Sequence, residues 1–225
     1  MKKQIYLILA VLGLGIAGAT AQEYSSSYYF PEGAGPYFQL EAGPTFFNNG
    51  NVKTFGGPAV GRVEYNTGGM INAAAGYAFN QYVAAGLELG FNGAKIDNAR
   101  GYFSDNSRIY NLPFMANVTL SCPIPHTILT PYAGVGAGGA DVVFDTDGFS
   151  DGVTTVVGTE NDVVFAWQAF AGLRLQLNRH VSLGLGYKYF ATGDPTFSYP
   201  PSPKFDVGFK GAQTHSVLAS VQVIF

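Results

Sequence analysis

The last thirteen residues of the chain, QTHSVLASVQVIF from Gln213 to Phe225, alternate between two kinds of side chain. Counting back in twos from Phe225 gives two valines, an alanine, a valine and a histidine, whereas the intervening positions are largely small or polar. A period of two residues is that of a β-strand and not of a helix. Because about nine to eleven alternating residues cross a membrane as a strand, this segment is long enough to be a transmembrane β-strand.

The start of the chain, MKKQIYLILAVLGLGIAGATA, combines Lys2 and Lys3 with an apolar run and an Ala-Thr-Ala motif. This arrangement is typical of a secretory signal peptide, and its apolar run is too short for a membrane-spanning helix. We therefore expect residues 1–21 to be a signal peptide, residues 22–36 an N-terminal lead-in and residues 37–225 one β-barrel domain. Loss of the two lysines takes the formal net charge from −3 to about −5, which argues against nucleic acid as a partner.

Composition narrows the choice of fold further. Only 12% of the residues are charged, against about a quarter in an average soluble protein. No segment after the signal peptide is a long apolar run, so membrane-spanning helices are excluded. A membrane protein without apolar helices must cross as a closed β-barrel, because every backbone polar group needs a partner within the bilayer. The single Cys122 allows no internal disulfide.

The same alternation recurs along the rest of the chain and predicts seven further strands. The eight predicted strands are residues 37–44, 62–79, 82–92, 108–121, 127–138, 163–177, 181–189 and 213–225. Short connections follow the second, fourth and sixth strands, and long loops follow the odd-numbered ones. Outer-membrane barrels have this asymmetry, with short turns on the periplasmic side. The sequence therefore predicts an all-β, eight-stranded antiparallel up-and-down transmembrane β-barrel.

Aromatic residues cluster near the ends of the predicted strands, as expected for the two girdles of such a barrel. The periplasmic girdle would contain Phe38, Tyr77, Phe79 and Phe225, and the outer girdle Phe91, Tyr110, Phe165, Trp167, Tyr187 and Tyr189.

Three segments, GYAFNQYVAAGLELGF, LTPYAGVGAGG and LQLNRHVSLGLGYKYF, resemble the strand-turn-strand segments of the small OmpA/Opa-like outer-membrane β-barrel family. The resemblance implies export to the outer membrane of a Gram-negative type of bacterium. It also implies contact with outer-membrane lipids, the barrel-assembly machinery and periplasmic chaperones, and a monomeric state. In that family a terminal phenylalanine on the lipid face belongs to the signal that the assembly machinery reads, a role that would fall to Phe225.

Four charged residues, Glu41, Glu88, Arg174 and Lys188, occupy positions that strand parity places on the inner face. An eight-stranded barrel is only wide enough for side chains to fill it, so charges inside must pair or contact trapped water. One interpretation is a salt-bridge network that plugs and stiffens the barrel. The other, suggested by similar networks in related barrels, is that re-pairing of these charges gates a narrow ion path.

Residues that could carry catalysis or bind a metal are poorly placed in this pattern. His126 and His180 fall in short turns, and His215 and Ser216 point to opposite faces of one strand. The acidic segment 139–162 contains DTDGFSDG, which departs from the EF-hand calcium loop. We therefore expect no enzyme activity, no metal and no cofactor.

The sequence thus favours a structural outer-membrane protein that supports envelope integrity, with surface loops for adhesion or for contact with an unidentified ligand. The alternative is a narrow passive porin-like channel gated by the interior charges. A third hypothesis is an outer-membrane lipid-modifying enzyme. A soluble lipocalin-like barrel is the main rival fold, but the small, Gly- and Ala-rich inner face argues against a ligand cavity lined by bulky residues.

Overall fold

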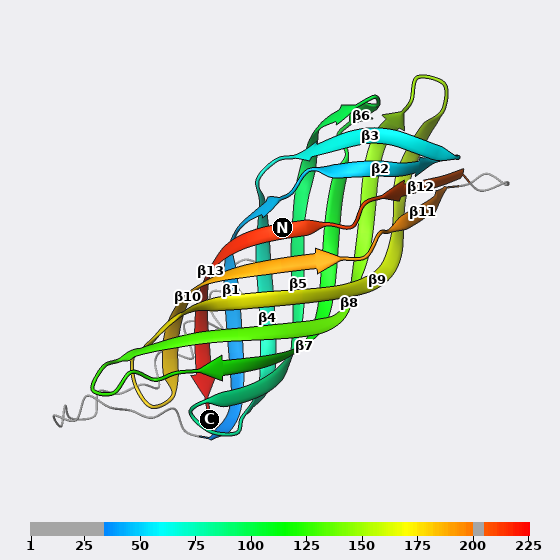
Figure 1. The fold of residues 1–225 in the computed structure, drawn as a ribbon. Coiled ribbons are helices and arrows are strands. Elements are labelled where there is room, and N and C mark those ends of the chain that lie inside the picture. Colours follow the sequence, from blue (N-terminus) through cyan, green and yellow to red (C-terminus); the bar gives the residue numbers. More distant parts are fainter. Residues whose placement is uncertain (1–33, 200–204) are drawn as a thin grey trace, which may run out of the picture.

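The computed structural model describes residues 34–199 and 205–225, and its strands form an elongated, tilted wall (Figure 1). The predicted signal peptide and most of the lead-in lie outside the described residues. No helix in the described ranges is long and apolar enough to cross a membrane. The strands are β1 (Gly35–Phe47), β2 (Gly50–Phe55), β3 (Pro58–Tyr65), β4 (Gly68–Ala78), β5 (Val83–Arg100), β6 (Phe103–Asp105), β7 (Arg108–Ser121), β8 (Leu129–Ser150), β9 (Thr155–Gln176), β10 (Val181–Thr192), β11 (Thr196–Tyr199), β12 (Phe205–Phe209) and β13 (Gln213–Ile224).

Eight of these strands close a ring in which every neighbouring pair is antiparallel. The order around the ring is β1, β4, β5, β7, β8, β9, β10, β13 and back to β1. At the closing pair, Tyr37 lies opposite Ile224 and Phe47 lies opposite Thr214. The prediction of an eight-stranded up-and-down barrel is therefore confirmed.

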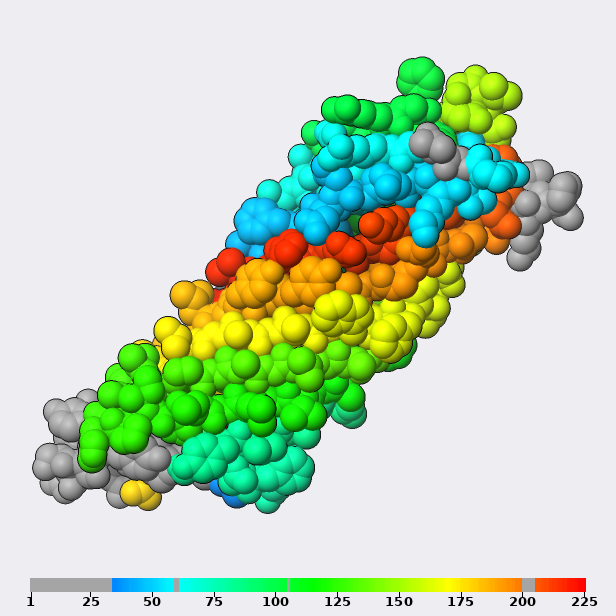
Figure 2. Space-filling model, in the orientation of Figure 1, coloured from blue at the N-terminus to red at the C-terminus, as the bar shows by residue number. Residues whose placement is uncertain are grey.

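The two faces of the ring differ as strand parity predicts. Outward positions carry exposed apolar side chains, such as Leu87 at 69% and Leu185 at 62% exposure. Strands β8, β9, β10 and β13 run side by side as one continuous wall in Figure 2. The inward positions hold small or polar residues packed against their neighbours; a side-chain carbon added at Gly134 would meet the ring of Phe170.

The prediction of four long loops is wrong over most of their length. Residues 45–61 and the start of the predicted second strand form β2 and β3, and β5 continues to Arg100 before β6. Segment 139–162 is the outer part of the β8–β9 hairpin, and segment 191–212 contains β11 and β12. Glycines lie at the tips of two of the resulting hairpins: Gly56 has φ of +65° and Gly152 has φ of +92°, backbone angles that suit glycine.

The residue pattern of the acidic segment explains why it forms strands and not a loop. Asp141 and Asp145 point outward, whereas Val142 and Phe144 between them are fully buried. Alternation of carboxylates with apolar residues gives one face for water and one for a core. The acidic residues are thus the solvated side of a sheet.

We call β2, β3, β6, β11 and β12, with the ends of β5, β8 and β9 that they accompany, the outer extension. It stands at the end of the ring opposite Phe225 (Figure 1) and contains the sheet order β11, β12, β2, β3, β5. Lys53 on β2 forms an ion pair with Asp194. Partial burial acts to raise the pKa of Asp194, but hydrogen bonds from Lys53 and from the Gly211 amide outweigh it and lower that pKa.

Candidate functional site: the filled lumen

A buried ion triad lies inside the ring. Lys188 on β10 contacts Glu41 on β1, and its Nζ lies 2.8 Å from Oε1 of Glu88 on β5. All three side chains are at most 8% exposed. One ammonium thus joins three strands that are far apart in sequence, and two carboxylates share its charge.

Amide side chains supply the remaining hydrogen bonds of the two carboxylates. Glu41 accepts bonds from Asn72 (2.7 Å) and Gln39 (3.1 Å). Gln39 donates to Oε2, the oxygen that the ammonium leaves, whereas Asn72 donates to Oε1, which also contacts Lys188, so both oxygens of this buried charge have partners.

The second carboxylate is held in the same way. Glu88 accepts bonds from Asn117 (2.9 Å) and Gln168 (3.2 Å), and Gln168 also donates to the Asn117 side-chain oxygen at 2.8 Å. The prediction of interior charges did not include these amides in the network. Their inward parity was the available signal, but parity alone does not say which side chains meet.

Arg174, the fourth predicted interior charge, lies beside the triad. Its guanidinium carbon is 4.6 Å from the centre of the Tyr132 ring, a cation–π geometry. Glu41, Glu88, Arg174 and Lys188 all border one enclosed cavity of about 20 Å³, which is room for about one water molecule. The four predicted residues are therefore gathered at one level of the lumen.

Toward the outer extension the lumen becomes apolar. Phe144 and Phe149 on β8, Phe197 on β11 and Phe209 on β12 are at most 1% exposed. The ring centres of Phe144 and Phe209 are 4.9 Å apart, and Phe149 packs edge-on against both rings. We call these four residues the aromatic plug; it belongs to a larger core with buried valines such as Val52 and Val63. The plug and this core pack the inner side of the outer extension.

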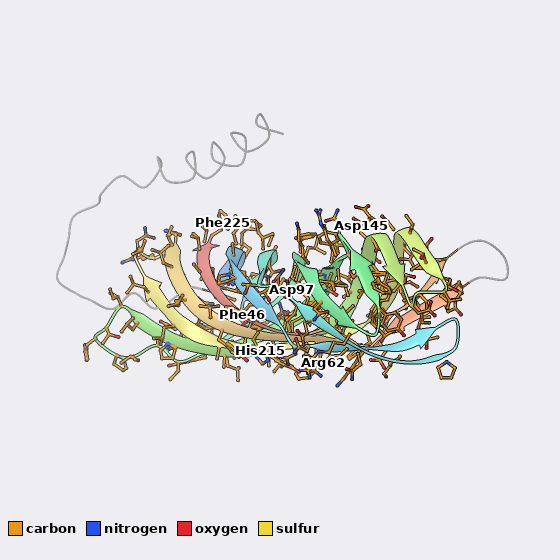
Figure 3. All side chains as sticks on the ribbon, turned by 90° about the horizontal axis from the view of Figure 1, so that it is seen from above. Phe46, Arg62, Asp97, Asp145, His215 and Phe225 are labelled. Carbon is orange, nitrogen blue, oxygen red and sulfur yellow. The ribbon has the colours of Figure 1, made fainter. Side chains whose placement is uncertain are left out.

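The histidines do not meet in the structure. His126 and His180 lie in connections, and His215 points outward on β13, where its Nδ1 is 2.6 Å from the Tyr187 hydroxyl. In Figure 3 His215 lies beside its register partner Phe46. Ser216 points the other way and shares a 2.6 Å hydrogen bond with Thr45. Within the described ranges no three His, Cys, Asp or Glu side chains are grouped so that they could hold a metal ion.

Phe225 ends the chain on the outward face. Its side chain is 73% exposed, while its backbone N–H donates to the Pro36 carbonyl at 2.9 Å. The main chain therefore contributes to ring closure, and the aromatic side chain stands exposed on the outer face of the ring.

We predict that replacing Phe225 with alanine leaves the thermal stability of the folded barrel unchanged within about 0.5 kcal/mol, since the ring packs on little else in the chain. If the ring is an assembly signal, the amount of folded protein in outer membranes should fall several-fold, measured by the band that shifts on boiling in gel electrophoresis. Phe38→Ala, at another outward aromatic of the same end, is the matched control. Equal losses for the two variants would remove the special role of the terminal residue.

Comparison with known proteins gives one family and a set of similar folds. The model of the family described as outer membrane protein beta-barrel domain matches residues 7–225. No curated protein matches the chain. Among solved structures, the outer membrane protein OprG from Pseudomonas aeruginosa has a TM-score of 0.57 at 13% identity, over 84% of this chain and 97% of that one.

Two further structures have the same fold. Outer membrane protein AlkL, solved in DMPC lipid bilayers, has a TM-score of 0.51 at 15% identity over 92% of this chain and 96% of its own. Neisserial surface protein A has a TM-score of 0.50 at 18% identity over 86% of this chain and all of its own. At these identities the similarity is one of fold.

Proposed function

This chain belongs to the family of outer membrane protein beta-barrel domains, and from that premise we propose that it is a plugged structural barrel of the outer membrane. Its outer extension presents a rigid surface for adhesion or ligand contact, and the barrel supports envelope integrity. The observation that carries this proposal is the filling of the lumen at two levels, by the ion triad and by the aromatic plug.

The outer extension supports the second half of the proposal. Where the sequence predicts loops, strands extend the wall and pack on an apolar core, so the surface that they present is held in one shape. A surface that is already ordered loses little conformational entropy when a partner binds. The chain would act as a monomer with outer-membrane lipids around it, and would reach the membrane through periplasmic chaperones and the barrel-assembly machinery.

A narrow passive channel is the alternative, and the polar half of the lumen favours it. A second small cavity, also of about 20 Å³, borders Arg174, Tyr37 and Gln222 near the end with the short turns. Each cavity has room for about one water molecule, so ions would need a rearrangement of both the triad and the aromatic plug. We propose no catalytic role, because the three histidines lie apart from one another and from the interior charges.

Conductance across a planar bilayer tests the proposal. We expect the purified barrel to show no steady ion current, and Arg174→Ala to remain closed while its melting temperature falls. Currents in the parent protein that change in Arg174→Ala would instead establish the channel. If Arg174→Ala altered neither conductance nor melting temperature, Arg174 would have neither a plugging nor a gating role.

A further inference from the structure

Two neighbouring strands in the outer extension are not joined by a hydrogen-bonded ladder. Residues 155–165 of β9 pair with β8 on one side, but β10 pairs with β9 only as far as Ala166. The last backbone bond on that side of β9 runs from the Gly193 N–H to the Phe165 carbonyl, at 2.8 Å. β11 then lies beside the outer part of β9 (Figure 1), yet among the described strands it pairs only with β12. We call the unpaired line between β9 and β11 the seam.

Residues on both sides of the seam interrupt regular strand pairing. If the register in which Thr192 faces Ala166 continued, Pro195 would face Val163, but proline has no N–H to donate. On the other side, the register between β8 and β9 shifts next to Gly158, which has φ of +118°. Such a shift bends and twists a strand locally. The sequence thus leaves β9 and β11 adjacent but unpaired.

A side chain takes the place of the missing ladder. The N–H of Thr196, the first residue of β11, donates to a carboxylate oxygen of Asp162 on β9 at 2.9 Å. The Tyr199 hydroxyl also reaches the Phe144 carbonyl on β8, but at 3.4 Å this is a weak bond. A carboxylate that accepts a backbone N–H makes a charge-assisted hydrogen bond, which is stronger than a neutral one. Asp162 is therefore the main polar tie across the seam.

β11 and β12, which we call the flap, are held to each other by more bonds than β11 is to β9. Four residue pairs form their ladder, and the Ser198 hydroxyl donates to Asp206 at 2.6 Å. The Phe209 N–H donates to the Pro195 carbonyl at 3.1 Å. On its other edge β12 pairs with β2. The flap is thus a unit that is joined to β2 by a ladder and to β9 by side-chain contacts.

The aromatic plug is divided between the flap and the wall that faces it. Phe197 and Phe209 belong to the flap, whereas Phe144 and Phe149 belong to β8. The ring centres of Phe144 and Phe209 are 4.9 Å apart, so the two halves of the plug meet inside the outer extension. Movement of the flap away from β9 would part them and uncover side chains that are now at most 1% exposed.

We propose that the outer extension opens at the seam, the flap swinging away from β9 as a unit while β12 stays paired with β2. The bond between Asp162 and Thr196 is the latch. Parting the seam breaks this bond but no ladder, whereas parting β12 from β2 breaks a ladder. The closed flap is the major state, because opening also uncovers the plug. Opening does not depend on the proposed role in adhesion or on whether the lumen conducts ions.

Reaction of buried cysteines with iodoacetamide tests the proposal on the detergent-solubilised barrel, in a Cys122→Ser background. Val142→Cys lies on β8 opposite Asp162, Val207→Cys lies in the flap, and Val63→Cys lies on β3, away from the seam. All three valines are fully buried. We expect the first two cysteines to react at similar rates and at least tenfold faster than the third, because the swing uncovers only the seam side of the core.

Variants of the latch distinguish the swing from other motions. Asp162→Ala should speed the reaction of the first two cysteines about tenfold, since a charge-assisted hydrogen bond is lost, and leave the third unchanged. Asp162→Asn should stay close to the parent, because its amide oxygen still accepts the Thr196 N–H. Asp206→Ala is the matched control: it removes a carboxylate that is bonded within the flap, so the rates should not change.

Two results would overturn the proposal. Equal reaction rates at all three cysteines would mean that the outer extension opens as a whole and not at the seam. A fast cysteine at 142 with a slow one at 207 would mean that β11 frays alone while β12 stays in place. The boiling-dependent gel shift verifies that each variant is folded.

Discussion

Replacing Lys188 with methionine is expected to lower the free energy of unfolding by about 3–5 kcal/mol, since it leaves two buried carboxylates without a cation. The melting temperature should fall on the order of 10 °C. Glu41 and Glu88 would then face each other and the polar lumen with only amide donors around them. Thermal unfolding in detergent, followed by circular dichroism or by the boiling-dependent gel shift, measures the loss.

A triple variant distinguishes the charge effect from loss of packing. Combining Lys188→Met with Glu41→Gln and Glu88→Gln removes every charge of the triad while keeping similar volumes. We expect it to recover most of the lost stability, because replacing all members of a buried ion cluster is often nearly neutral. Lys53→Met is the surface control: its partner Asp194 is about half exposed, so the loss should be at most about 1 kcal/mol. A triad variant no worse than this control would show that the interior charges do not hold the ring.

Replacing Phe144 with alanine should destabilise the outer extension by about 3–5 kcal/mol, the usual effect of removing a fully buried aromatic ring. The ring centre of Phe144 lies within 6 Å of three other rings, those of Phe149, Phe197 and Phe209, so a cavity would form at the middle of the plug. Amide hydrogen exchange in β2, β3 and β12 should speed up by about a hundredfold or more. Exchange in β10 and β13, which pair within the ring, should change little.

Phe103→Ala is the matched control for this variant, because Phe103 is also in the outer extension but is 71% exposed. Its exchange rates should stay close to those of the parent protein. The conductance of Phe144→Ala adds a second readout. If ions pass only once the plug is weakened, the polar half of the lumen is not itself the barrier. Unchanged exchange in Phe144→Ala would contradict the plug as a cooperative core.

Strand parity predicted the ring and the inner placement of its charges, and the reason is physical. If the register of β10 shifted by one residue, Leu185 would point into the lumen and Lys188 into the lipid. The sequence is therefore compatible with only one assignment of inner and outer faces. Parity does not fix which inward residues meet. Lys188 on β10 meets Glu41 on β1 because both strands pair with β13, which lies between them in the ring. The alternation within a single strand does not predict such pairing between strands that are distant in sequence.

The outer extension was missed for a different reason. The sequence predicts a long loop at 45–61 because Asn48, Asn49, Gly56 and Gly57 are residue types that interrupt strands, yet the same types also make the tight turns between strands. Within 139–162 the order of acidic and apolar residues around Phe144 already had a period of two. The high negative charge of this segment favours a solvated loop, whereas its period of two favours strands. A hairpin in water needs apolar residues only on the face that it buries.

The pairing of β2 with β12 has a consequence for how the protein comes apart. The ring closes where β1 meets β13, and the Thr45–Ser216 bond there joins residues 171 positions apart. Beyond that closure, β2 also pairs with β12, with Phe55 opposite Val207. The N-terminal segment β1–β2 is therefore hydrogen-bonded to the C-terminal segment β12–β13 at two successive strand pairs. Separation of β1 from β13 therefore also requires β2 and β12 to part. If both strand pairs must separate together, the barrel unfolds slowly. This slow unfolding would protect the protein kinetically, in addition to its equilibrium stability.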